Sequence, residues 1–396
     1  MAEENKAFAD WVKIPVVVQH QFFELATKEA EAAKRKLLAD AIKIEKLGKH
    51  LKFSEAPRSD AWRDWTIACV DGSDSPMLSE RIGARYGTYA AGYMTFEQGA
   101  LKEEDFKSGY ISHQQVGDPD VTKKVLDLLM VKLEREIALD LAPHVDVVLI
   151  DGSFFGWRTG CSQIRGEAIS VEGYKTAGEL INHIRDTTLQ LLETRKAVGV
   201  IKRVRTAALD GWVAYTQSER NCIDRNDRAI LGRLMTPSTW FAYHWLFENP
   251  EAYNYYTYIR RVLRENPHLD KASIMRKAKE RYEGSVASDL NCNPDKFKTA
   301  RYYHRTTSAA PPFSFEIRKD MPHLETLPAY FQAPENYNTA TGLPFPIDLI
   351  DQNVSLPAGF TKEFVEEIEA QLVRDPTLNK FDLANSFGRL NPQKEE

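Results

Sequence analysis

One short motif occurs twice in this chain, and the repetition constrains the fold more than any other feature. Residues 66–70 (TIACV) lead into Asp71-Gly72-Ser73, and residues 146–150 (DVVLI) lead into Asp151-Gly152-Ser153. A short apolar run rich in β-branched residues predicts a buried strand, and an acidic residue followed by glycine predicts the turn that leaves the sheet. Two such strands side by side would hold two carboxylates at one sheet edge, and carboxylates suit hard divalent cations.

Each copy alone has a simpler explanation, because Asp-Gly is a common turn dipeptide. Two copies on equally apolar strands favour a shared chemical role. Metal ions held between two such aspartates can activate a water and stabilise a leaving oxygen at a phosphodiester, as a nuclease requires.

The bulk composition bounds the class of protein. The 396 residues suffice for one large domain with insertions or for two domains, and 43% hydrophobic residues predict a sizeable core. A net charge of -5 argues against indiscriminate coating of nucleic acid but leaves room for a local basic channel. The four cysteines form no CxxC pair, so neither a zinc site nor a disulfide framework is expected. With no apolar run of membrane-spanning length and no apolar leader, we expect a cytoplasmic protein without membrane contact.

The element pattern predicts a mixed α/β fold. Apolar residues at helical spacing predict one long helix over residues 16–49, which packs on its own domain or on a partner. Residues 86–96 predict a second strand, and the polar residues 101–117 are interpreted as a loop. Helices over residues 118–141 and 177–196 each lead into an apolar strand, the first with Asp118 as its cap. A central sheet flanked by helices is the assembly that such a pattern favours.

Residues 236–298 have a different character, with many aromatic residues followed by basic, helical sequence. Such a mixture can grip nucleic acid through phosphate contacts and base stacking, and the alternative is a solvated helix face over an aromatic core. We therefore expect four segments: an N-terminal helical segment (1–55), the first part of the core (56–235), an aromatic and basic helical insertion (236–300), and the completion of the core with a C-terminal helix (301–396).

Further side chains are candidates to complete a metal site. The helix before the second motif carries Glu134, our preferred third carboxylate, and Glu136 as the alternative. Lys202 ends the third strand, where it could orient a water or hold the scissile phosphate. Asp351 follows an apolar pair and is a possible fourth ligand, although Asp348 or Asp351 could instead cap a helix.

Other chemistries fit poorly. The chain has no GxxxxGK[ST] loop, so it should not hydrolyse ATP alone, and it has neither an HExxH motif nor a GxSxG nucleophile elbow.

The order of these motifs resembles the NurA nucleases, from about residue 60 to 356. The series runs from the two Asp-Gly-Ser strands through Val200-Ile201-Lys202-Arg203 and Tyr302-Tyr303-His304-Arg305 to the Pro344-Phe345-Pro346 element before Asp351. The resemblance implies an RNase H-like core, closest to nuclease domains of the Argonaute type, in a homodimer that encloses a DNA channel. It also implies a manganese-dependent nuclease that degrades DNA from 5′ ends and cuts single strands. The usual partner would be HerA, a hexameric ATPase that pumps DNA during end resection or, in some bacteria, in defence against phage.

Carried over by motif, Asp71 and Asp151 match the two aspartates, Glu134 the helix glutamate and Lys202 the strand lysine. Archaeal members often carry a histidine where this chain has Asp351, and an aspartate can still bind a hard metal ion.

We expect two Mn²⁺ or Mg²⁺ ions per site, with Asp71 bridging both. As DNA contacts we predict five residues that follow the third strand or lie in the YYHR motif: Arg203, Arg205, Tyr303, His304 and Arg305. The alternatives are a DNA-binding adaptor of a motor ATPase with a vestigial nuclease site, and an RNase H-like enzyme that acts on RNA.

Overall fold

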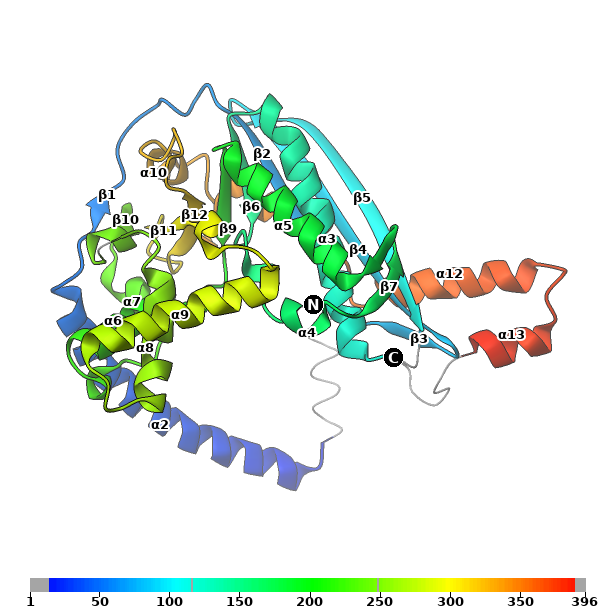
Figure 1. Cartoon of the computed structure of the whole chain (residues 1–396), viewed down its shortest axis with the longest axis horizontal. Coiled ribbons are helices and arrows are strands. Elements are labelled where there is room, and N and C mark those ends of the chain that lie inside the picture. Colours follow the sequence, from blue (N-terminus) through cyan, green and yellow to red (C-terminus); the bar gives the residue numbers. More distant parts are fainter. Residues whose placement is uncertain (1–13, 115–116, 248, 389–396) are drawn as a thin grey trace.

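The apolar runs beside the two Asp-Gly-Ser motifs are neighbouring parallel strands in the middle of a ten-stranded sheet (Figure 1). They are β2 (Thr66–Asp74) and β6 (Val147–Asp151), and β9 (Ala197–Ile201) pairs in parallel with β6 on its other side. The computed structural model describes residues 14–114, 117–247 and 249–388.

Antiparallel strands extend the sheet on both sides of this parallel centre. Beyond β2 lies β4 (Ala84–Glu97), which pairs with β3 (Ser79–Arg81) and β5 (Ala100–Gln114). Beyond β9 the order continues through β12 (Phe313–Arg318), β11 (Thr299–Arg305), β10 (Thr239–Ala242) and β1 (Ser54–Glu55). The predicted class, a mixed sheet flanked by helices, is confirmed.

The prediction of a loop at residues 101–117 is wrong, because β5 runs through most of this segment. Among the described strands it pairs with β4 alone, and most of its side chains are exposed, so it needs no apolar run to be a strand. The signal lies in the turn: Gln98 and Gly99 both have positive φ, as the two central residues of a type I′ hairpin turn require.

Helices cover both faces of the sheet. The alternation along β2 and β6 sends Val70 and Ile150 to the face covered by α3 (Pro119–Leu141) and α5 (Ala177–Glu193). Cys69 and Leu149 point to the opposite face, which α10 (Leu327–Gln332) and α11 (Phe345–Val354) cover. The predicted cap of α3 is present, since the Asp118 side chain accepts a hydrogen bond of 2.9 Å from the Asp120 amide.

The other helices of the described ranges are α2 (Val16–Gly48), α4 (Cys161–Ile164), α6 (Ala208–Thr216), α7 (Asp227–Leu234), α8 (Tyr253–Glu265), α9 (Lys271–Leu290), α12 (Phe360–Arg374) and α13 (Lys380–Phe387). Among them, α6 and α7 pack on β10 and β11. A small hairpin of β7 (Ala168–Val171) and β8 (Tyr174–Thr176) precedes α5. None of the helices in the described ranges is long and apolar enough to cross a membrane.

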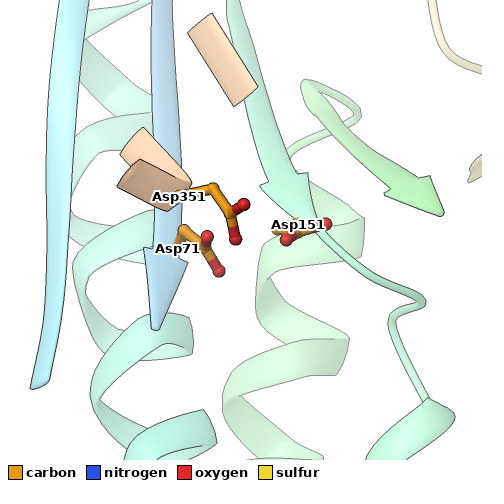
Figure 2. A group of neighbouring side chains, drawn as sticks. All are labelled: Asp71, Asp151 and Asp351. Atoms are coloured by element: carbon orange, nitrogen blue, oxygen red, sulfur yellow. The ribbon is translucent and has the colours of Figure 1, made fainter. Parts of the chain in front are cut away.

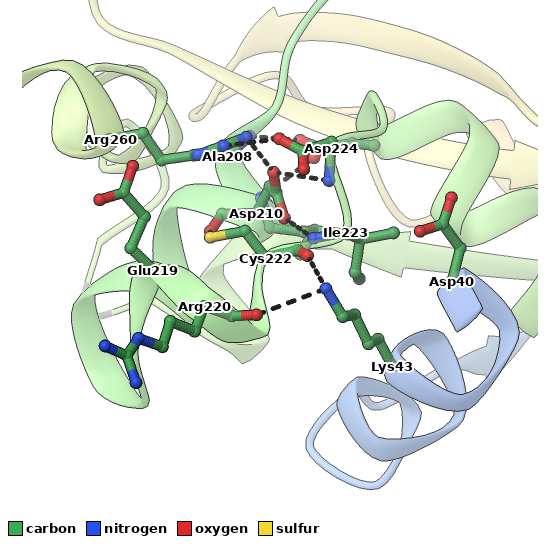
Figure 3. A network of polar contacts seen from close by, with 12 residues as sticks. Asp40, Lys43, Ala208, Asp210, Glu219, Arg220, Cys222, Ile223, Asp224 and Arg260 are labelled. Atoms are coloured by element: carbon green, nitrogen blue, oxygen red, sulfur yellow. Dashed lines mark hydrogen bonds and ion pairs between the residues drawn. The ribbon is translucent and has the colours of Figure 1, made fainter. Parts of the chain in front are cut away.

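The predicted long N-terminal helix is α2, and only its C-terminal part packs on the molecule (Figure 1). Ile44 and Leu47 are buried there, and the Lys43 ammonium donates to the backbone carbonyl of Cys222 at 2.5 Å (Figure 3). In the same network Asp210 accepts from the Ile223 amide at 2.6 Å and from Arg260 of α8 at 2.7 Å, which ties α2, α6 and α8 together. Eight apolar side chains of α2 remain exposed: Val16, Val17, Phe22, Phe23, Leu25, Leu37, Leu38 and Ile42.

The aromatic start of the predicted insertion belongs to the core. Phe241 and Tyr243 are fully buried, and β10 pairs with β11 inside the main sheet. Many basic side chains of α8 and α9 form ion pairs, for example Arg281 with Glu265 at 2.6 Å, so this pair of helices carries little unpaired positive charge. The segment boundaries at residues 55, 235 and 300 stay predictions.

The packing of α6 against α8 yields a sharp prediction at Gly211. A Cβ atom there would lie 1.9 Å from the backbone carbonyl oxygen of Tyr256, so the two helices must separate in Gly211→Ala. We expect a loss of at least about 2 kcal/mol of unfolding free energy. Gly284 of α9 has open space around its Cα, and Gly284→Ala should raise stability by about 0.5–1 kcal/mol through helix propensity. Urea denaturation of both variants measures this, and equal stability of Gly211→Ala and the unchanged protein would contradict the packing.

Candidate metal centre

Three aspartates from distant parts of the sequence converge at one edge of the sheet. Asp71 lies on β2, Asp151 ends β6, and Asp351 lies in α11, and one carboxylate oxygen of each lies within 4.8 Å of the others (Figure 2). The parallel register explains the first two, because Val70 is opposite Ile150 and the next residue on each strand is the aspartate. Asp351 reaches the same place because its neighbour Ile350 is buried under the sheet. Asp351 lies inside α11 and Pro344 is the N-cap, so helix capping does not explain it.

Lys202 brings a positive charge into this group. It follows the last residue of β9, and its ammonium lies 2.9 Å from Asp151 and 3.1 Å from Asp351. Burial lowers the pKa of Lys202, but the interactions with Asp151, Asp71 and Asp351 together outweigh burial and the net shift is upward. The ammonium therefore stays charged and offsets part of the repulsion among the carboxylates.

The surroundings of Asp71 favour the binding of a cation. The side chain is only 5% exposed, its Oδ1 accepts a hydrogen bond of 2.8 Å from the Gly72 amide, and its buried Oδ2 has no hydrogen-bond partner among the described residues. Burial, then the charges of Asp151 and Glu134, raise the pKa of Asp71 well above its ordinary value. Burial also raises the pKa of Asp151, against the opposing effect of Lys202. The site offers hard oxygen ligands, several negative charges, and one buried oxygen without a hydrogen-bond partner among the described residues. These properties suit a divalent metal ion.

The structure separates the two candidate glutamates of α3. Glu134 is 4% exposed and accepts a hydrogen bond of 2.7 Å from Arg135, which also donates to the backbone carbonyl of Ser153 at 3.2 Å. Burial raises the pKa of Glu134 to about 7, although Arg135 opposes the shift. Glu136 instead pairs with Lys132 and His183, each at 2.8 Å, in the groove between α3 and α5. Glu134 is thus the glutamate that acts on Asp71, although its oxygens lie outside the group of three.

The predicted DNA contacts divide into two sets. Arg203 and Arg205 are exposed after β9, and the charge of Arg203 acts on Asp151. Tyr303 and His304 are completely buried, so neither can touch a DNA strand, and their prediction as DNA contacts is corrected. Tyr303 shares a hydrogen bond of 3.1 Å with Tyr243, and His304 contacts Gln332 at 3.2 Å.

Arg305 also has a structural role. Its guanidinium donates to the backbone carbonyls of Gly232 and Met235, each at 2.6 Å. Because both faces of β11 are covered, Tyr302, Tyr303 and His304 all lie in the core and not at a DNA surface.

Two polar residues next to the aspartates escaped the sequence reasoning. Glu316 of β12 is 3% exposed and accepts a hydrogen bond of 2.6 Å from the Ser153 hydroxyl, and Arg135 links Glu134 to the same serine. A glutamate between two apolar residues of a buried strand was the available signal for Glu316. No sequence signal pointed to Arg135, because an arginine beside a glutamate on a helix is common.

Converging carboxylates and a lysine at the ends of parallel strands form an arrangement that could hold a divalent metal ion, as in metal-dependent hydrolases. The family model described as the NurA domain matches residues 66–356, which is most of the chain. The chain therefore belongs to the NurA family, as the motif order suggested, and it is a nuclease.

Solved structures agree in fold. The NurA nuclease from Sulfolobus solfataricus is 14% identical with a TM-score of 0.54, over 92% of this chain and 100% of that chain. A second NurA structure is 11% identical with a TM-score of 0.53, over 90% and 99%. A structure of NurA with manganese is 11% identical with a TM-score of 0.50, again over 90% and 99%. A comparison with curated protein sequences gave no match.

The raised pKa of Glu134 predicts how stability depends on pH without metal. The folded state holds the Glu134 proton up to about pH 7, whereas the unfolded chain releases it near the ordinary value of 4.5. The resulting stabilisation, on the order of 3 kcal/mol, is therefore present below pH 4.5 and lost as the pH rises through 7. Glu134→Gln has no carboxyl proton to lose at this position. Its unfolding free energy, relative to that of the unchanged protein, should therefore increase as the pH rises from 4.5 to 8. Denaturant titrations in EDTA measure the difference, and parallel pH profiles would contradict it.

Proposed function

We propose that this NurA-family nuclease hydrolyses phosphodiester bonds of DNA with two divalent ions, Mn²⁺ or Mg²⁺, held by Asp71, Glu134, Asp151 and Asp351. The observation that carries the proposal is the convergence of three aspartate oxygens within 4.8 Å of one another, beside a buried Asp71 Oδ2 that has no hydrogen-bond partner among the described residues. The manganese named for a structure of the same fold supports a divalent ion of this kind.

The side chains of the centre have distinct roles in this proposal. Bound metal ions would supply an activated water and stabilisation of the leaving oxygen. Asp71 is the most buried of the three aspartates and faces the other two, which suits a ligand shared between ions. Arg135 holds Glu134 in place through a charge-assisted hydrogen bond. Lys202 sits beside Asp151 and Asp351, where its ammonium can hold the scissile phosphate or orient the attacking water.

The proposed substrate, DNA, and the proposed direction of its degradation are taken from the family resemblance. DNA would approach over the exposed Arg203 and Arg205, which put positive charge beside the carboxylates of a chain with a net charge of -5. We include degradation from 5′ ends and cutting of single strands in the proposal.

The test is a digestion of end-labelled single- and double-stranded DNA with Mn²⁺, Mg²⁺ or EDTA. Asp71→Asn should lower the rate by more than about 100-fold, because even the outer partners of metal ligands typically contribute 10–100-fold. Asp74→Asn is the matched control: it lies on the same strand but pairs with Lys123 at 2.6 Å, and it should keep its activity.

Three outcomes would count against the proposal. Full activity of Asp71→Asn would contradict the site. A protein that binds DNA but leaves it intact in every metal would support the adaptor alternative. Digestion of a matched RNA in preference to DNA would support the RNA-directed one.

The proposal extends to partners: a homodimer, and a HerA-type hexameric ATPase that translocates DNA during end processing or anti-phage defence. The exposed apolar side chains of α2 support a partner surface, because a helix with Phe22 and Phe23 at 53% and 59% exposure leaves a large apolar area in water. We assign this surface to the second copy.

This assignment predicts the behaviour of a surface variant. Sedimentation equilibrium should give a dimer for the unchanged protein and a monomer for Phe22→Ser with Phe23→Ser, since the double change removes two large apolar contacts. Phe106→Ser on β5, another exposed aromatic residue at 40%, is the control. A monomeric unchanged protein would contradict the homodimer, and a dimeric double variant would contradict the role of α2.

A further inference from the structure

A second cavity, polar and open, lies next to the aspartates. Its volume is about 220 Å³, and the loop after Asp151, helices α8 and α9, and strands β11 and β12 form its walls. The lining includes Ser153, Tyr253, Tyr258, Tyr282, Arg301 and Glu316. None of these residues is a candidate metal ligand.

The cavity and the metal centre share one wall. Ser153 follows Asp151 by two residues, so their Cα atoms lie within about 7 Å of each other. Arg135 donates to Glu134 on the side of the metal centre and to the backbone carbonyl of Ser153. The Ser153 hydroxyl donates to Glu316 on the side of the cavity. The loop after Asp151 therefore borders both the aspartates and the cavity.

The charges in the walls are already balanced. Arg301 pairs with Glu316 at 3.3 Å and donates to the Thr206 hydroxyl at 2.7 Å. Arg158, at the rim, pairs with Asp289 at 2.8 Å. Since each guanidinium has its own carboxylate, the cavity lacks the excess positive charge that a phosphate group would need.

The aromatic side chains offer a surface for stacking. Tyr253 is occupied, with Tyr243 stacked at 5.0 Å and the Arg301 guanidinium 4.8 Å from its ring centre. Tyr258 and Tyr282 are half-buried, and their ring centres lie 6.4 Å apart on adjacent helices. Half-buried tyrosines beside polar donors and acceptors recognise unstacked nucleobases.

We propose that this cavity takes one base of the DNA strand, adjacent to the phosphate held at the aspartates. The inference rests on the proposed nuclease function and adds a site to it. The volume agrees with a single base, because cavities for larger, drug-sized ligands measure roughly 300–1,000 Å³. The base stacks on Tyr258, and Tyr282, whose ring plane is inclined by 57° to that of Tyr258, lies against the edge of the base. A base enters such a cavity only from a single strand or a frayed end.

A double-mutant cycle between protein and DNA tests the proposal. The probes are single-stranded oligonucleotides of one length, each with one abasic site at a different position. Binding is measured in Ca²⁺, a hard cation that the same oxygen ligands accept, with a gel to confirm that the strand stays intact. One abasic position should weaken binding to the unchanged protein by roughly 10-fold, the loss of one stacked base.

Tyr258→Ala should weaken binding of the intact strand by a similar factor but leave binding of that one abasic strand unchanged, because both changes remove the same contact. Tyr258→Phe keeps the ring and should bind normally, as should Tyr110→Ala on β5, outside the cavity. Additive losses, or a uniform abasic profile with the unchanged protein, would overturn the proposal. The abasic profile is measured with the unchanged protein, so a uniform profile would overturn the proposal even if Tyr258→Ala fails to fold.

Digestion of the intact strand in Mn²⁺ separates the two proposals. A protein that degrades DNA but shows no special abasic position refutes the cavity alone. A protein that neither binds nor degrades DNA refutes the nuclease proposal and the cavity with it.

Discussion

The parallel pairing of β2 with β6 is the constraint on which the site depends. It places Val70 opposite Ile150, so Asp71 within β2 and Asp151 at the end of β6 lie side by side. A shift of either strand by one residue would turn its aspartate to the other face and set its apolar side chains against the wrong layer of helices. The fully buried residues on both faces of these strands hold the register, so the hydrophobic core and the carboxylate pair are specified by the same interaction.

Bringing the carboxylates together has an electrostatic cost that the chain only partly offsets. Lys202 and Arg135 each neutralise one neighbour, but the pKa values of Asp71, Asp151 and Glu134 are all raised, chiefly by burial. In addition, the buried Oδ2 of Asp71 has no hydrogen-bond partner among the described residues. Without a cation the centre is thus a local weak point of the fold, and binding of a divalent ion would stabilise the folded state. Buried carboxylates whose negative charge is only partly neutralised are typical of functional sites and unusual for a structural core.

Much of this could be predicted from the sequence, where local patterns decide the outcome. The apolar runs, the Asp118-Pro119 cap and the positions of Asp71 and Asp151 all depend on residues close in the chain. Long-range packing decided the rest. Strand β5 is set by its pairing with β4, although its own residues are polar and exposed. Tyr303 and His304 belong to a strand with both faces covered, which the sequence of β11 alone does not reveal. Arg135 and Glu316 gain their roles only through Ser153, which lies far from Glu316 in the sequence.

The central claim is that Asp71, Asp151 and Asp351 bind a metal ion, and anomalous diffraction from crystals soaked in Mn²⁺ tests it most directly. The structure predicts a manganese peak bonded to Oδ2 of Asp71 and to an oxygen of Asp151, with Lys202 drawn away from its ion pairs. A map without manganese at these side chains, and with Lys202 still paired to Asp151 and Asp351, would contradict the assignment.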